Sequence, residues 1–289
     1  MTITIFTPSY NRAYTLVKLY KSLCEQTDKN FIWLIVDDGS TDNTEELVNR
    51  WIREKIIDIR YLKQKNAGKS AAHNTGVNNT KTELFCCVDS DDVLTMDAIA
   101  EIKRDSSRLS QCIGIVYKRG THENDVITKW DKSLNSATFF DAEKKFGLRG
   151  DTMLVFKVQY LKKYSFPVFQ GEKFVPENYL YDYLSNEGEL LFIDKVLYLC
   201  EYLPDGYTSN MRRVIVNNPL GYRAYIKKRV RMNYSFIEKL KDVARFVAIQ
   251  CVIEKKEIFK QSPSLFYTIF ALPLGVYFYR KEYKKYLDE

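Results

Sequence analysis

A short acidic segment, Asp89-Ser90-Asp91-Asp92, holds the residues of this chain whose type and spacing best suit chemistry. It follows an apolar run over 82–88, which we expect to be a buried strand, and precedes a helix expected over 95–108. Acids at the end of a buried strand face the crevice where open α/β sheets bind ligands. Two carboxylates one residue apart can hold a hard divalent cation, which readily bridges phosphates. The alternative is a solvated acidic turn that caps the next helix.

Three other polar clusters also lie between an expected strand and an expected helix. They are Thr7-Pro8-Ser9-Tyr10-Asn11-Arg12, Asp37-Asp38-Gly39-Ser40-Thr41-Asp42, and the segment 66–76, which opens with Asn66-Ala67-Gly68-Lys69-Ser70. The expected strands are 2–7, 31–37, 57–62 and 82–88, and the expected helices are 13–26, 42–54, 69–79 and 95–108. This alternation predicts βαβ units in a parallel sheet with helices on both faces. Asp42 and Glu45 are predicted to form the capping pair of the second helix.

The four polar clusters, in this order and spacing, resemble the donor-site signature of the family 2 nucleotide-sugar glycosyltransferases, whose fold is called GT-A. The match covers residues 1–120 closely and residues 150–215 loosely. The resemblance implies an α/β protein with a GT-A-like nucleotide-binding mixed sheet flanked by helices. It also implies inverting transfer of a hexosyl or N-acetylhexosaminyl group from a UDP-sugar, with Mn²⁺ or Mg²⁺ as the metal.

The first two clusters are expected to recognise the nucleoside. Pro8 fixes the backbone of the first loop, Tyr10 offers a flat ring beside a nucleobase, and Asn11 belongs to the same loop. The resemblance assigns Asp38 to a hydrogen bond from uracil; the alternative is turn chemistry at an Asp-Gly pair. Asp37 is expected either to take part or only to orient the loop.

The third and fourth clusters are expected to bind the diphosphate and ribose. Lys69 opens a helix whose N–H groups suit phosphate or ribose oxygens, although a solvated lysine is the alternative. The resemblance makes Asp91 a direct ligand of Mg²⁺ or Mn²⁺, and Asp89 a residue that holds ribose or a metal-bound water. Asp92 is expected to cap the following helix. His73, one turn into its helix, faces either the site or the core.

The base that activates the acceptor is expected among the acids near residue 177. The family commonly has an acidic Glu-Asp pair there at the start of a helix. This chain has Glu177-Asn178, so either Glu177 is the base or Asp182, one turn later, replaces it. The alternative for Glu177 is an acid favoured by the helix dipole. Farther on, in the segment 205–213, Arg212 or Arg213 could clamp the diphosphate, unless this is only a solvated basic loop.

The second half of the chain is expected to complete the domain and then turn helical. Strands are predicted over 113–117, 151–156 and 190–199, with a short helix over 177–184. We expect a glycosyltransferase domain over 1–218, with nucleotide-sugar binding in 1–110 and the acceptor and catalytic part in 111–218. A helical region over 219–289, broken near 261–264, is predicted to follow.

Composition limits the setting in which the protein works. The 289 residues are 45% hydrophobic, enough for a sizeable core. The six cysteines show no C-x-x-C spacing and are expected to be free thiols in a reducing compartment. No secretory signal precedes the first expected strand, so a cytoplasmic protein is expected.

Positive charge is concentrated in the last third of the chain. Residues 203–289 contain 17 basic and 8 acidic side chains, a net charge of +9 within a total of +7. An uncharged, aromatic run over 265–279 is too short to span a bilayer but suits its interface. We therefore expect peripheral binding at the inner face of the cell membrane and a lipid-linked saccharide or nascent surface polysaccharide as acceptor. The alternative is a helix packed on the protein's own catalytic domain.

Two other function classes fit part of the sequence. A sugar-nucleotide nucleotidyltransferase would share the metal and the sheet, but its glycine-rich basic loop near the N-terminus is absent. A non-catalytic nucleotide-sugar binding module would keep Asp38 and Asp91 and lose the base. Nucleic-acid binding is not expected, because no such motif accompanies the basic region.

Overall fold

The computed structural model describes residues 1–122, 125–200, 210–232 and 235–287. Its contacts divide the chain into two compact units, each described here by itself. Unit 1 consists of residues 1–165 and 183–201, and unit 2 of residues 166–182 and 202–289. The sequence did not foresee that 166–182 would group with the C-terminal helices.

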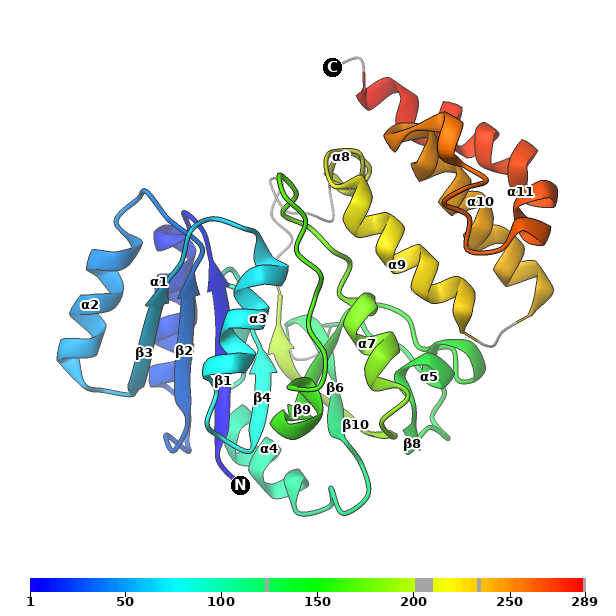
Figure 1. The fold of residues 1–289 in the computed structure, drawn as a ribbon. Coiled ribbons are helices and arrows are strands. Elements are labelled where there is room, and N and C mark those ends of the chain that lie inside the picture. The colour runs from blue at the N-terminus through cyan, green and yellow to red at the C-terminus, as the bar shows by residue number, and fades with distance from the viewer. Residues whose placement is uncertain (123–124, 201–209, 233–234, 288–289) are drawn as a thin grey trace. The chain divides into compact units, whose positions relative to one another are not determined.

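Unit 1 is built on a mixed sheet with the strand order β3-β2-β1-β4-β9-β6-β10-β5. Strand β1 pairs in parallel with β2 and β4, β2 pairs in parallel with β3, and β9 lies antiparallel between β4 and β6. The strand bounds are β1 Ile3–Ser9, β2 Ile32–Asp37, β3 Asp58–Lys63, β4 Leu84–Cys87, β5 Val93–Leu94, β6 Gly114–His122, β7 Asp125–Val126, β8 Ser136–Ala137, β9 Thr152–Lys157 and β10 Leu190–Leu199. The predicted α/β class is confirmed, and Figure 1 shows the first strands side by side.

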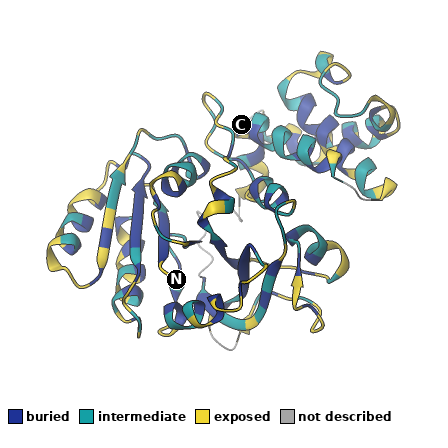
Figure 2. Ribbon diagram, turned by 60° about the horizontal axis from the view of Figure 1, so that its bottom comes forward, coloured by how far each residue is buried: buried dark blue, intermediate teal, exposed yellow. Residues whose placement is uncertain are grey.

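Helices flank the sheet because successive strand residues face opposite sides. Ile3 and Ile5 belong to a core that also contains side chains of three helices: α1 (Ala13–Cys24), α2 (Thr44–Glu54) and α4 (Ala98–Ser106). Phe6 faces the helix α3 (Lys69–Asn79), where a Cβ at Gly76 would lie 2.4 Å from its ring. The strands β1 and β2 are accordingly buried along most of their length (Figure 2).

The predicted capping pair of α2 is wrong. The helix begins at Thr44, and Asp42 accepts hydrogen bonds from the Thr44 N–H and hydroxyl and from the Ala13 N–H. Glu45 instead pairs with Lys63 of β3, its Oε2 lying 2.6 Å from Nζ. Asp42 therefore joins two helix starts, which a local pattern could not indicate.

Unit 2 is helical, as expected for the C-terminal region. Its core lies mainly among three helices: α9 (Pro219–Arg231), α10 (Phe236–Ile253) and α11 (Leu265–Phe278). No helix among the described residues is long and apolar enough to cross a membrane. The other helices among the described residues, in either unit, are α5 Phe139–Lys145, α6 Val158–Leu161, α7 Asn178–Leu184, α8 Met211–Asn217, η2 Lys255–Glu257, η3 Tyr279–Tyr283 and η4 Lys284–Tyr286.

Candidate functional site

The four polar clusters meet at one edge of the unit 1 sheet. Strands β3, β2, β1 and β4 are successive neighbours and run parallel, so the loops that follow them leave the sheet at the same edge. Backbone hydrogen bonds join the loops: the Asp38 N–H donates to the Ser9 carbonyl, and the Gln64 N–H to the Asp37 carbonyl. The sheet topology therefore brings the four polar clusters together within one unit.

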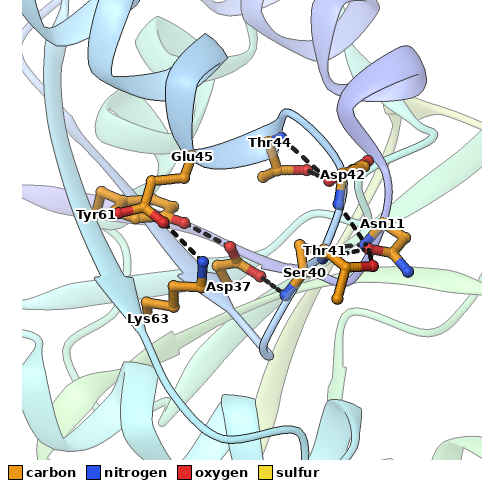
Figure 3. A network of polar contacts seen from close by, with 9 residues as sticks. All are labelled: Asn11, Asp37, Ser40, Thr41, Asp42, Thr44, Glu45, Tyr61 and Lys63. Carbon is orange, nitrogen blue, oxygen red and sulfur yellow. Dashed lines mark hydrogen bonds and ion pairs between the residues drawn. The ribbon is translucent and has the colours of Figure 1, made fainter.

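Asn11 ties the first loop to the second. Its φ of 52° lies in the left-handed region that asparagine tolerates. Its N–H donates to the Ser40 hydroxyl, and its Oδ1 accepts hydrogen bonds from the Thr41 and Asp42 N–H groups at 2.8 and 3.3 Å (Figure 3). These contacts give Asn11 a positioning role; direct contact with a nucleotide stays a prediction.

Asp37 orients its own loop, one of the two roles expected for it. Its side chain is fully buried, accepting from the Ser40 N–H at 2.7 Å and from the Tyr61 hydroxyl at 2.5 Å (Figure 3). Burial and the Asp37 carboxylate raise the pKa of Tyr61, which therefore stays a neutral donor.

Asp38 anchors the loop that precedes α3. Its carboxylate, 4% exposed, accepts from Gln64 Nε2 at 2.7 Å and from the N–H groups of Ala67 and Gly68 at 2.9 and 2.7 Å. Gly68 is the N-cap residue of α3, and its φ of 90° lies in a region that glycine adopts readily. Asp38 thus fixes the backbone at the start of that helix, and its contact with uracil stays a prediction.

The other residues considered on this side of the site differ in exposure. Tyr10 is 46% exposed, as a ring that stacks on a nucleobase must be, while Pro8 lies within β1 opposite Val36. Lys69 Nζ lies 2.7 Å from Asp89 Oδ1. His73 packs edge-on between Phe6 and Phe85, with ring centroids 5.7 and 5.4 Å apart, so its ring belongs to the packing under α3.

The hydroxyl of Tyr198, a residue that sequence reasoning missed, links two residues of the acidic turn by hydrogen bonds. The Asp89 N–H donates to the Tyr198 hydroxyl at 2.9 Å, and that hydroxyl donates to Asp92 Oδ2 at 2.7 Å. Arg119 lies over the Tyr198 ring, 3.8 Å from its centroid, with Nη1 3.9 Å from Asp92 Oδ2. Asp92 therefore does not cap the next helix, which begins at Ala98 after Asp97.

The acidic turn carries unfavourable negative charge. Burial raises the pKa of Asp91, and the negative charge of Asp89 raises it further, while Arg12 and Lys69 oppose the rise. Burial and the charge of Asp89 likewise raise the pKa of Asp92 to about 7. Crowded carboxylates of this kind favour a cation. Arg12, which acts on Asp91 from the first loop, was not assigned a role from sequence.

The residues present fit a divalent cation that is shared with a ligand. The described residues contain no group of three or more His, Cys, Asp or Glu side chains that could hold a metal ion alone. With Lys69 already paired to Asp89, Asp91 is the acid better placed to accept a metal. The remaining oxygen ligands would then come from phosphate and water, as is usual for Mg²⁺.

The two acids considered as the base differ sharply in accessibility, and both belong to unit 2. Glu177 is exposed, and its Oε2 lies 3.2 Å from the Tyr181 hydroxyl. Asp182 is 0% exposed and lies 3.5 Å from Nη1 of the buried Arg229, which also approaches Asp242. A general base must reach the proton that it removes. This burial favours Glu177 over Asp182.

The arginines expected to clamp the diphosphate contact the end of the chain. Arg212 Nε lies 2.5 Å from Glu282 Oε2, and the Arg213 guanidinium lies 6.0 Å from the centroid of the Tyr286 ring. The preceding segment 205–209 lies outside the described residues. A phosphate clamp at these two positions stays a prediction.

Comparisons with known proteins bear on the part of this site that lies within residues 4–165. The family model described as "Glycosyl transferase family 2" matches residues 4–165, more than half of the chain. The glycosyltransferase GlyA of Streptococcus pneumoniae is 41% identical over 97 residues, which is 34% of this chain and 14% of that protein. The matched segment thus spans about a seventh of the length of this curated relative.

Solved structures resemble almost the entire chain. Residues 1–349 of Staphylococcus aureus TarS in complex with UDP-GlcNAc superpose with a TM-score of 0.64 and 16% identity, covering 96% of this chain and 81% of that one. The mannosyltransferase PcManGT of Pyrobaculum calidifontis, in complex with GDP-Man and Mn²⁺, gives a TM-score of 0.58 and 18% identity, covering 99% and 82%. These likenesses establish the fold as GT-A.

The role of Tyr198 can be measured by unfolding. Tyr198→Phe removes the donor to the buried Asp92 carboxylate and the acceptor of the Asp89 N–H, so it should lower the free energy of unfolding by about 1–3 kcal/mol. Tyr20→Phe is the matched control, because its hydroxyl donates to Glu54 at an exposed site and should matter less. Urea unfolding of both variants provides the comparison. Equal stability of Tyr198→Phe and the wild type would contradict this role.

Proposed function

The chain belongs to glycosyl transferase family 2, and from that premise we propose that it transfers a sugar from a UDP-sugar to an acceptor hydroxyl, with inversion and with a divalent metal. The observation that carries the proposal is the meeting of four polar loops around Asp89 and Asp91 at one sheet edge. A nucleotide diphosphate sugar needs a place for its base, its diphosphate and its metal, and these loops offer all three.

The donor proposed is a uridine nucleotide. TarS, which resembles the whole chain, was solved with UDP-GlcNAc, whereas the mannosyltransferase was solved with GDP-Man. We assign uracil to the loop that contains Asp38, with the exposed Tyr10 ring beside the base. Because Asp38 already fixes the backbone of 67–68, its oxygens have a defined position from which to accept a further hydrogen bond.

The charges around the acidic turn suit a departing diphosphate. Asp91 would hold Mn²⁺ or Mg²⁺, assisted by Asp89, and the metal would supply stabilisation of negative charge on the leaving group. Lys69 Nζ forms an ion pair with Asp89 Oδ1 at 2.7 Å. The positive charge of Arg12 opposes the rise that burial causes in the pKa of Asp91. Tyr198 and Arg119 fix Asp92 beneath them, so the turn keeps its shape when charges enter or leave.

The transfer proposed is a single displacement. Glu177 takes the proton of the acceptor hydroxyl, the hydroxyl oxygen bonds to the anomeric carbon, and the bond from that carbon to the diphosphate oxygen breaks. UDP leaves with the bonding electron pair, and attack from the opposite side converts an α-linked donor into a β-linked product. No covalent intermediate with the protein is needed.

The acceptor proposed is a lipid-linked saccharide or a nascent surface polysaccharide at the cytoplasmic face of the membrane. The support is the basic and aromatic composition of the C-terminal region, which is typical of protein at a lipid interface. An acceptor carried on lipid would place the reaction at that surface.

Asp91→Asn tests the metal role. The variant should lose UDP-sugar turnover by at least ~10²-fold, because several kcal/mol of leaving-group stabilisation disappear. A panel of UDP-, GDP- and CDP-sugars with Mn²⁺ or Mg²⁺ and saccharide acceptors, followed by released nucleotide, makes the measurement. Asp58→Asn, at an exposed acid of β3, is the control and should keep full activity. Full activity of Asp91→Asn, or of the wild type in EDTA, would contradict the role.

Glu177→Gln tests the base. It should lower the turnover rate by at least ~10²-fold, the scale of lost general-base catalysis, with little change in donor affinity. Glu46→Gln, at an exposed helical acid, is the matched control. Asp182→Asn should act mainly through the free energy of unfolding, because Asp182 faces Arg229. A folded Asp182→Asn that loses turnover while Glu177→Gln keeps it would reverse the assignment. UDP binding without turnover in any donor and acceptor pair would favour a binding module.

A further inference from the structure

Helix α11 leaves four large apolar side chains of its first two turns exposed, while its fully buried positions hold small residues and other large residues are half-buried against the core. The buried members are Thr268, Ala271 and Gly275, whereas Leu265, Phe266, Ile269 and Phe270 are each between 57% and 61% exposed. An ordinary surface helix places its large apolar residues against the core. In α11 four such residues stay in water. If each were buried, it would contribute about 1.5–3 kcal/mol to the free energy of folding.

The packing of α11 on α10 fixes this orientation. A Cβ at Gly275 would lie 2.5 Å from Val247 Cβ and 2.8 Å from the Ala244 carbonyl oxygen. The two helices therefore meet through a glycine at a distance that no larger residue permits. Rotating the aromatic face inward would break this contact, so the exposed face is a property of the packed unit.

Neighbouring residues enlarge the exposed face into what we call the apolar patch. Phe236 and Ile237, in the first turn of α10, are 52% and 63% exposed, and the Phe236 ring lies 5.2 Å from that of Tyr267. The ring centroids of Phe266 and Phe270 lie 5.1 Å apart. The apolar patch consists of Phe236, Ile237, Leu265, Phe266, Ile269 and Phe270. Contiguous apolar surface of this kind marks a site that a partner covers.

Exposed positive charge is present in the same unit as the apolar patch. Exposed basic residues follow α11 and stand in the turn before it: Lys255, Lys256, Lys260, Arg280, Lys281, Lys284 and Lys285. The whole segment 203–289 has a net charge of +9. A second copy of this chain would bring the same positive charge against itself, whereas an anionic lipid surface attracts each nearby basic residue by about 1 kcal/mol.

We propose that the apolar patch and the exposed basic residues of the same unit bind the headgroup region of an anionic bilayer. The 14 residues of α11 are too few to span the hydrocarbon core, so the helix lies in the interface with its aromatic rings among the headgroups. This inference deepens the membrane location proposed above, and because it does not depend on donor chemistry, nucleotide-free protein tests it.

The test is sedimentation of the full chain with vesicles of phosphatidylglycerol and phosphatidylcholine, and with phosphatidylcholine alone. The protein should bind the anionic vesicles, more weakly as salt rises. The double variant Phe266→Ser with Phe270→Ser, and the double variant Lys281→Gln with Lys284→Gln, should each weaken partition by at least about tenfold. Two controls should bind as the wild type does: Met96→Ser with Ile56→Ser, at exposed apolar positions of unit 1, and Lys81→Gln with Lys132→Gln, at exposed lysines.

Fluorescence quenching by lipids tests the proposal even if one of these variants does not fold. In Phe270→Trp, brominated lipids should quench the added indole beyond the quenching of the native tryptophans. Absence of both vesicle binding at low salt and quenching would overturn the proposal. Binding that the serine variant leaves unchanged would also overturn it. A concentration-dependent dimer that ignores vesicles and disappears in the serine variant would identify a second copy as the occupant.

Discussion

The candidate site depends on keeping negative charges close together at the end of a buried strand. Asp89, Asp91 and Asp92 fall within one turn after β4, and burial together with mutual repulsion raises the pKa of the last two. Such a turn is stable only where other groups compensate it. Lys69 pairs with Asp89, and Tyr198 and Arg119 satisfy Asp92. In the function proposed here, a cation and a diphosphate would complete the charge balance.

The sheet topology places the loops of the site, and buried or partly buried side-chain oxygens fix the conformation of each loop. The parallel order β2-β1-β4 brings the loops to one edge, but backbone N–H groups that donate to the side-chain oxygens of Asn11, Asp37 and Asp38 fix their shapes. Each of these side chains accepts backbone N–H groups that a loop would otherwise leave to water. Residues predicted to touch the nucleotide thus serve first as supports for the backbone that surrounds it.

The sequence predicted what depends on local pattern. The first strands, the helices between them and the meeting of their polar loops follow from hydrophobic periodicity and from the rule that parallel strands end together; α3 has the predicted bounds 69–79. Partners that come from distant segments were not predictable. Tyr198 stands 109 residues after Asp89, within an apolar run that gave no sign of a polar role. The burial of Asp182 and the exposed aromatic side of α11 likewise depend on packing. A sequence shows that a helix is apolar without showing which side stays exposed.

The central claim is that Asp91 and the diphosphate of the donor share one divalent ion. Isothermal titration of the full chain with UDP and with uridine, each in Mn²⁺ and in EDTA, measures this directly. The account predicts that Mn²⁺ strengthens the binding of UDP by at least about tenfold, a gain of roughly 1.4 kcal/mol, and leaves uridine unaffected. In Asp91→Asn the gain should vanish. Equal affinity for UDP in Mn²⁺ and in EDTA would contradict the claim.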